Sequence, residues 1–153
     1  MGSKYITLKG KAKWARVFED NRDLKGYNGA YQETDGVCTI NVYLTKEEYQ
    51  KLKDAGSATK LKLDEETGER FIKLKRPFKG KHEWASGAPV VTKADGSVWS
   101  FEDDGAIGNG SEVEVTVVVY TTSMTPGTRL EKVKVLKPVS IKEKEVEVEG
   151  IPF

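Results

Sequence analysis

The longest β-type stretch of the chain reads SEVEVTVVVYTT, at residues 111–122. Valine occupies every second position from Val113 to Val119. Successive side chains of a strand point to opposite faces, so this period of two predicts a strand with these valines on one face. A glycine-rich bend at residues 103–110 precedes the stretch, and Pro126-Gly127 turns the chain after it. The stretch therefore indicates a mostly β chain with frequent turns.

Further strand signals lie on the N-terminal side of this stretch and after it. Residues 37–44 alternate, with Cys38, Ile40, Val42 and Leu44 on one face. Short turns join two pairs of β-type segments, which are predicted as hairpins: 60–63 with 69–75, and 90–92 with 97–101. Residues 11–19 and 129–135 are also rich in β-compatible side chains.

One segment has a helical period instead. Thr45 is followed three residues later by Glu48, which is a capping-box pattern. Tyr49 and Leu52 continue at helical spacing, and Gly56 stands where a C-terminal cap is expected. We predict one short helix at residues 46–55.

Several short strands, one short helix and closely spaced turns predict an all-β protein. About five main strands fit an OB-fold barrel, a five-stranded barrel that binds oligonucleotides or oligosaccharides, with an extra hairpin. A β-sandwich is the alternative fold. We expect the barrel to occupy residues 1–138 and residues 139–153 to form a flexible, mildly acidic tail.

Composition limits the function classes. The chain has 153 residues, of which 37% are apolar, which is enough for one domain with a core. Its 25 basic and 24 acidic residues exclude a globally basic, histone-like protein, but a local basic patch stays open. The single Cys38 allows no internal disulfide, and no apolar run is long enough to span a membrane. We therefore expect a cytoplasmic protein.

Catalytic and metal-binding patterns are weak. His82 is the only histidine, so a nucleophilic triad would depend on it, and Ser86 nearby has no nucleophile-elbow context. One histidine and one cysteine cannot form a zinc cluster. Three consecutive acids begin at Glu102, and they could bind a divalent cation, although such a turn is more often simply solvated. We expect no catalytic residue, no metal and no cofactor, and keep a metal-dependent enzyme as the weakest alternative.

Basic and aromatic residues gather on one face and in the loop that follows it. If Ile72 and Leu74 point to the core, Phe71 and Lys73 project from the opposite face. Similar residues recur on the first two strands and in residues 76–84. The candidate nucleic-acid contacts are Lys11, Lys13, Trp14, Arg16, Tyr43, Lys60, Lys62, Phe71, Lys73, Lys75, Arg76, Phe78, Lys79, Lys81 and Trp84.

This combination suits single-stranded nucleic acid. Its phosphates need cations along a groove, and its unstacked bases need flat aromatic surfaces, whereas a duplex hides its base faces. The opposing interpretation places Trp14, Phe18 and Trp84 in the core and leaves the lysines as a solvated face. That interpretation fits an all-β structural or assembly protein that binds no nucleic acid.

The C-terminal segment has a different composition. Residues 140–153 carry four Glu and two Lys, a net charge of −2, and the rest of the chain therefore carries +3. A terminal Phe with its α-carboxylate could dock in a partner's pocket. The candidate partner contacts are Glu147, Glu149, Ile151, Pro152 and Phe153. Alternation of Glu and Val over residues 143–149 leaves an edge strand as the other interpretation.

Two runs resemble a known family. GKAKWA at residues 10–15 and FEDDGAIGNGS at residues 101–111, with the valine-rich strand after it, resemble single-stranded DNA-binding proteins of tailed bacteriophages over most of residues 4–138. The resemblance implies an OB-fold that binds single-stranded DNA without strong sequence preference and supports phage replication, recombination and repair, in the cytoplasm of the infected bacterial host.

The tail separately resembles the acidic tip of bacterial single-stranded DNA-binding proteins. Its last three residues match that tip, but its acids are Glu and are interrupted by valines and Gly150. The resemblance implies recruitment of replication and recombination proteins by this tip. Weaker binding to duplex DNA and a homo-oligomeric state are left open.

Overall fold

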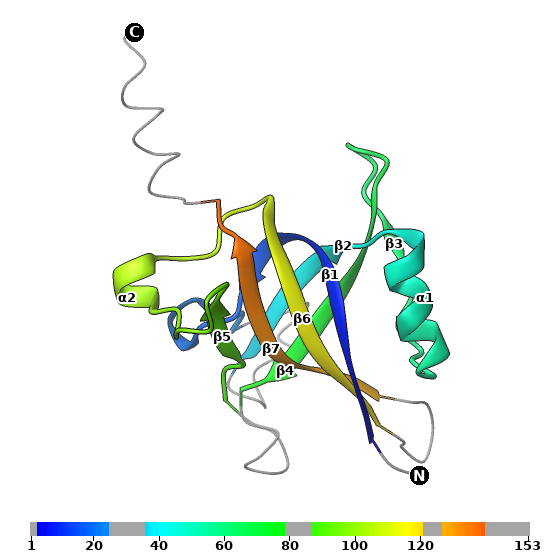
Figure 1. The fold of residues 1–153 in the computed structure, drawn as a ribbon, viewed down its shortest axis with the longest axis horizontal. Coiled ribbons are helices and arrows are strands. Elements are labelled where there is room, and N and C mark those ends of the chain that lie inside the picture. Colours follow the sequence, from blue (N-terminus) through cyan, green and yellow to red (C-terminus); the bar gives the residue numbers. More distant parts are fainter. Residues whose placement is uncertain (1–2, 25–35, 79–86, 121–126, 140–153) are drawn as a thin grey trace, which may run out of the picture.

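The structure, a computed structural model, describes residues 3–24, 36–78, 87–120 and 127–139 (Figure 1). Its elements in chain order are β1 (Ser3–Arg16), the 3-10 turn η1 (Glu19–Asn21), β2 (Val37–Tyr43), α1 (Lys46–Asp54), β3 (Lys62–Leu63), β4 (Arg70–Pro77), β5 (Val90–Lys93), α2 (Phe101–Asp104), β6 (Ser111–Tyr120) and β7 (Gly127–Lys137). The described part contains no helix long and apolar enough to cross a membrane.

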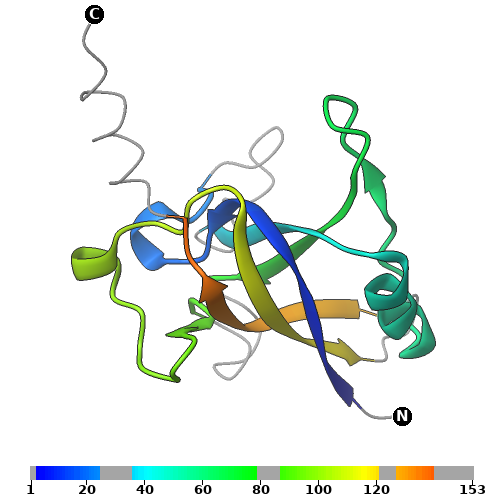
Figure 2. The same cartoon turned by 45° about the horizontal axis from the view of Figure 1, so that its top comes forward.

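All seven strands belong to one sheet in the order β3-β4-β2-β1-β6-β7-β5. The central five are antiparallel, and β1 pairs with β6 along Ser3–Ala12 and with β2 from Lys11 onward. Because β1 changes partner along its length, the sheet bends, and β4 comes into contact with β7 (Figure 2). The predicted all-β barrel of five main strands is confirmed.

The interior follows the alternation of the strands. Val113, Val115 and Val117 of β6 are fully buried, as are Ile40 and Val42 of β2. At the bend of β1, a Cβ on Gly10 would collide with the backbone oxygen of Tyr43. Glycine therefore lets β1 approach β2 closely at the point where the barrel turns.

The predicted helix is confirmed as α1. The hydroxyl of Thr45 accepts a hydrogen bond from the backbone N–H of Glu48 at 3.3 Å, as the capping pattern predicts. Leu52 is completely buried in the core, and α1 packs against β1 at one side of the barrel (Figure 1). The helix is thus fixed by its cap and by the burial of Leu52, with Tyr49 packed against the same core.

Three features differ from the sequence prediction. Strand β1 begins at Ser3, well before residue 11, because its first half pairs with β6. The alternation of Ile6 with the completely buried Leu8 is a strand signal that the prediction did not use. Residues 97–101 form no strand, and only the isolated bridge between Thr92 and Val98 remains of that predicted hairpin. Strand β5 instead pairs in parallel with β7.

A second short helix, α2, begins at Phe101, at the end of the segment that was predicted as a strand. The hydroxyl of Ser100 accepts from the N–H of Asp103, and the carboxylate of Asp104 accepts from the N–H of Ser100 at 2.8 Å. A Ser followed within four residues by acids is a capping signal, and it would have predicted this helix from the sequence.

Candidate nucleic-acid interface

The outer face of β1, β2, β4 and β3 carries three cross-strand rows. The first joins Lys11, Tyr43, Phe71 and Lys62, each directly opposite its neighbour. The second joins Lys13, Asn41 and Lys73, and the third joins Arg16, Thr39 and Lys75. Residues directly opposite each other share a face of the sheet. Eight of the fifteen candidate contacts therefore lie on one surface, which we call the outer face.

An aromatic pair lies in the first row. The rings of Tyr43 and Phe71 are 5.1 Å apart between centroids and tilted by 33°. Phe71 is half-buried, whereas Tyr43 is only 8% exposed although it points away from the core. The ring of Tyr43 is covered by Phe71 and by Lys13, whose Nζ is 4.8 Å from the ring centroid. Tyr43 therefore supports Phe71 and offers little free surface of its own.

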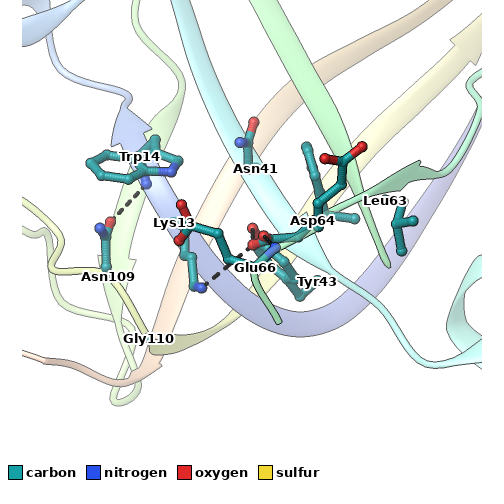
Figure 3. Close-up of a pocket in the computed structure, with 11 residues that line it drawn as sticks. Lys13, Trp14, Asn41, Tyr43, Leu63, Asp64, Glu66, Asn109 and Gly110 are labelled. Carbon is teal, nitrogen blue, oxygen red and sulfur yellow. Dashed lines mark hydrogen bonds and ion pairs between the residues drawn. The ribbon is translucent and has the colours of Figure 1, made fainter. Parts of the chain in front are cut away.

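Asp64, in the turn between β3 and β4, ties these groups together. Its carboxylate accepts a 2.6 Å hydrogen bond from the Tyr43 hydroxyl and lies 3.8 Å from Lys13 Nζ (Figure 3). The hydrogen bond from Tyr43 lowers the pKa of Asp64. Burial and the same hydrogen bond raise the pKa of Tyr43 to about 12. At neutral pH the Tyr43 phenol is therefore neutral and Asp64 is a carboxylate.

Trp14 projects beside this cluster and is 65% exposed. Strand β1 has a bulge between Lys13 and Arg16, where the register with β2 shifts. Trp14 lies in this bulge with a φ of 53°, and its backbone N–H donates to Asn109 Oδ1 at 2.8 Å (Figure 3). The bulge keeps Lys13 and Arg16 in the rows of the outer face and turns the indole outward.

These side chains line a pocket of about 700 Å³. Trp14, Tyr43 and Phe71 supply aromatic surface, and Lys13 supplies a cation. The amides of Asn41 and Asn109 add hydrogen-bonding groups, while the hairpin turn contributes the acids Asp64, Glu65 and Glu66. Aromatic faces with a few polar groups and a cation form a surface on which an unstacked base can lie next to a phosphate.

Arg76 does not belong to this surface, which corrects its assignment as a phosphate contact. It is 6% exposed and lies on the core side of β4. Its guanidinium donates to the backbone oxygen of Leu130 at 3.3 Å and to Glu131 Oε2 at 3.0 Å. Glu131 also pairs with Arg129. Arg76 therefore joins β4 to β7, where the barrel closes, and the alternation from Leu74 could have predicted its side.

The other candidate contacts divide into two groups. Phe78 packs on Arg22, whose Cζ is 4.1 Å from its ring centroid, and it does not line the pocket. Lys60 is exposed but lies outside the paired strands. Outside the described residues lie Lys79, Lys81, His82, Trp84, Glu147, Glu149, Ile151, Pro152 and Phe153.

The sequence left open whether Trp14 and Phe18 belong to the core or to the surface, and the structure gives a different answer for each. Phe18 is buried and packs on Phe101 at 5.1 Å between ring centroids. Trp14 is exposed. The core interpretation therefore holds for Phe18 and is wrong for Trp14.

Of the three acids of α2, Asp104 has a local structural role. Asp104 caps the helix and pairs with Lys93 at 3.2 Å, and the hydrogen bond from Ser100 lowers its pKa. Glu102 and Asp103 are exposed. Among residues 3–24, 36–78, 87–120 and 127–139, no three His, Cys, Asp or Glu side chains gather as metal ligands would.

The residues of the site that were not predicted include Asn41, Asp64 and Asn109. Asn41 stands alone between Ile40 and Val42, and Asp64 begins an acidic turn, so neither belongs to a binding motif. Asn109 lies in the Ile-Gly-Asn-Gly-Ser run that carries the family resemblance, but its contact with Trp14 spans 95 positions and could not be inferred from spacing.

No protein-family model matches the chain, and no curated protein matches it by sequence. Solved structures do. The gp2.5 protein of bacteriophage T7, a single-stranded DNA-binding protein, is similar with a TM-score of 0.58 and 17% identity, over 90% of this chain and 93% of that chain.

The single-stranded DNA-binding protein of bacteriophage Enc34 is similar in two structures at 12% identity. Its C-terminally truncated form has a TM-score of 0.57 over 89% of this chain and 87% of that chain. Its complex with single-stranded DNA has a TM-score of 0.56 over 89% and 88%. At these identities the likeness shows the fold, and it confirms the predicted OB-fold.

Proposed function

We propose that this protein binds single-stranded DNA without sequence preference on the outer face. The observation that carries the proposal is the cross-strand arrangement of Lys13, Lys73 and Phe71 beside the exposed Trp14. Cations from neighbouring strands lie next to aromatic surface, which is the combination that a flexible strand needs. The shared fold with two phage proteins that are described as single-stranded DNA-binding supports it.

The site favours a single strand over a duplex for two reasons. A duplex hides its base faces, so Trp14 and Phe71 would gain no stacking. The acids Asp64, Glu65 and Glu66 at one wall of the pocket also repel a second phosphate backbone. We expect duplex DNA to bind weakly and only at low salt.

A titration tests the proposal. The purified protein is titrated into fluorescent oligo-dT and into a matched duplex, each at low and high salt, while tryptophan fluorescence is followed. We expect tight, salt-sensitive binding to the single strand with tryptophan quenching. Equal affinity for both forms would contradict stacking, and no binding to either would favour a structural or assembly protein.

The salt dependence identifies the cations. Each phosphate neutralised on a single strand contributes about −0.7 to the slope of log affinity against log salt. Lys73→Ala should therefore make the slope shallower by about 0.7. Lys132→Ala is the matched control, because Lys132 is an exposed cation on β7, which is separated from β1 by β6. An equal change in both variants would contradict the assignment to the outer face.

The biological role extends the proposal. We infer a non-enzymatic protein that protects single-stranded DNA during phage replication, recombination and repair in the infected bacterial cytoplasm. The supports are the shared fold and the similarity of the residue runs 10–15 and 101–111 to phage proteins. A host infected with phage that lacks this gene should accumulate unprotected single strands, and normal phage DNA synthesis would contradict this role.

The tail is proposed as the contact for replication and recombination proteins, through Glu147, Glu149, Ile151, Pro152 and Phe153. Deleting residues 150–153 should leave oligo-dT affinity unchanged and abolish capture of purified replication proteins. The matched control replaces the same residues with Gly-Ser-Gly-Ser, which keeps the length. If both variants still capture the replication proteins, residues 150–153 are not the contact.

A further inference from the structure

The backbone of Trp14 is held in an unfavourable conformation. Among the described residues it is the only non-glycine with a positive φ, at 53°. A bulky residue rarely adopts this region, because its Cβ crowds the backbone. Such a conformation persists where the surroundings enforce it, and it often accompanies a functional site.

The loop before β6 enforces it. Asn109 Oδ1 accepts from the Trp14 N–H at 2.8 Å, and Gly110 N–H donates to the oxygen of Ala12 at 2.8 Å. The loop is itself fixed, because Ser111 Oγ donates to Gly108 O at 2.7 Å and Gly108 N–H donates to Val139 O at 3.0 Å. Asn109 therefore reaches Trp14 from a rigid support.

Trp14 lines two pockets. The first is the pocket of about 700 Å³ already described, which Lys13 and Phe71 also line. A second pocket of about 570 Å³ is lined by Trp14 and Asn109 as well, together with Arg16 and Arg22. Both pockets thus share Trp14 and Asn109, and each has a cationic lining of its own, Lys13 in the first pocket and Arg16 and Arg22 in the second.

From this arrangement we propose that Trp14 is a wedge between two adjacent nucleotides, with one base stacked in each pocket, and that Asn109 is the positioning residue that holds it there. The proposal rests on the proposed function and adds the path of the strand, which crosses the bulge of β1. The phosphates on the two sides meet Lys13 and Arg16, which lie in neighbouring rows of the outer face.

The first test compares two aromatic residues in oligo-dT binding. A base stack contributes at least about fivefold to affinity, so two stacks multiply to about 25-fold or more. Trp14→Ala should therefore weaken binding by about 25-fold or more, whereas Phe71→Ala, which removes one stack, should weaken it by about fivefold or somewhat more. Equal losses in the two variants would contradict a two-sided wedge.

The second test observes the separation of the bases directly. Two adjacent 2-aminopurines give an exciton-coupled circular dichroism band only while they stack on each other. The pair is scanned along the shortest oligo-dT that binds with full affinity. We expect the band to collapse at one position with the wild-type protein and to survive at every position with Trp14→Ala. A band that survives at every position with bound wild-type protein would overturn the wedge.

The third test separates positioning from general destabilisation. Asn109→Ala removes the acceptor for the Trp14 N–H and should restore much of the band at saturating protein. Asn109→Asp keeps an acceptor oxygen at the same place and should give a collapsed band again. Because the Asp also adds a negative charge, Asn41→Asp in the first pocket is its control. A fully collapsed band with Asn109→Ala would overturn the role of Asn109.

Oligo-dT binding and the 2-aminopurine band together distinguish a failure of the wedge proposal from a failure of the proposed function. If the wild-type protein does not bind oligo-dT at all, the proposed function fails. If it binds tightly with tryptophan quenching but leaves the 2-aminopurine pair stacked throughout, only the wedge fails.

Discussion

The two faces of β2 and β4 come from alternating residues of the same short segments, yet they are organised differently. On the inner face Ile40, Val42, Ile72 and Leu74 are buried to 1% exposure or less, and the packing excludes solvent. On the outer face a buried Tyr43 is surrounded by charged groups and hydrogen-bonded to one of them. The inner face is thus determined by shape and volume, and the outer face by pairing of charges with aromatic rings.

Neighbouring cations on β4 show the same contrast. Lys75 is exposed on the outer face, whereas Arg76 lies inside and pairs with Glu131. Two adjacent basic residues therefore have different roles, because the alternation of the strand, and not charge, decides which one meets solvent.

The largest effect should come from the inner face. Leu74→Ala removes a side chain that is 1% exposed and should lower the free energy of unfolding by about 2–5 kcal/mol. Its neighbour Lys73→Ala on the outer face should change it by no more than about 0.5 kcal/mol. Urea unfolding measures both. Similar losses in the two variants would show that the faces are not distinct.

Arg76→Met should have the next largest effect. Removing one member of a buried ion pair costs about 3–5 kcal/mol, but here Arg129 stays 2.6 Å from Glu131, so we expect about 2–3 kcal/mol. The same urea experiment measures the loss. The affinity of the folded variant for oligo-dT should stay unchanged. A weakened affinity would show that Arg76 takes part in DNA binding.

Phe71→Ala tests the outer face by binding. Because Phe71 is half-buried, the lost base stack should weaken oligo-dT binding by about fivefold or somewhat more, which is the lower end of about 1–3 kcal/mol per stack. Stability should change less than in Leu74→Ala, because Phe71 is only half-buried and rests on Tyr43. Fluorescence titration and urea unfolding of the same preparation give both values. Unchanged affinity for oligo-dT would show that Phe71 does not contact the DNA.

The smallest effect should come from Asp64, whose carboxylate pairs with Lys13. Asp64→Asn should free Lys13 for a phosphate and tighten oligo-dT binding by up to about fivefold, because exposed ion pairs contribute at most about 1 kcal/mol. Asp95→Asn is the control for net charge, since Asp95 lies in the turn after β5, outside this pocket. Equal tightening in both variants would indicate a long-range charge effect only.

Asp64 also predicts a pH dependence. Its pKa in the folded protein is lowered below its ordinary value of 3.8. The unfolded chain therefore binds a proton first as the pH falls, so the stabilisation by Asp64 is present above about pH 4 and disappears as the pH falls through the lowered pKa. Urea unfolding between pH 6 and about pH 3 should show a smaller decline in Asp64→Asn than in the wild type.

Local signals predicted much of the fold. The period of two assigned the core faces of β2, β4 and β6, and the cap at Thr45 located α1. The first half of β1 was not predicted although Ile6 and Leu8 alternate there. The parallel pairing of β5 was not predicted because it depends on a partner strand far away in the chain. On the outer face, alternation correctly placed Phe71 and Lys73, but it could not predict that Asp64 would contact Lys13.

By itself, the sequence determined which residues of each strand face the core, where the main helix lies and that basic and aromatic residues share a surface, because these follow from periods of two and 3.6 and from local capping. Tertiary structure alone decided that Trp14 is exposed and Arg76 closes the barrel. It also decided that Asn109 supports Trp14. Each of these depends on residues brought together by the bending of β1 and the closure of the sheet, which no local pattern encodes.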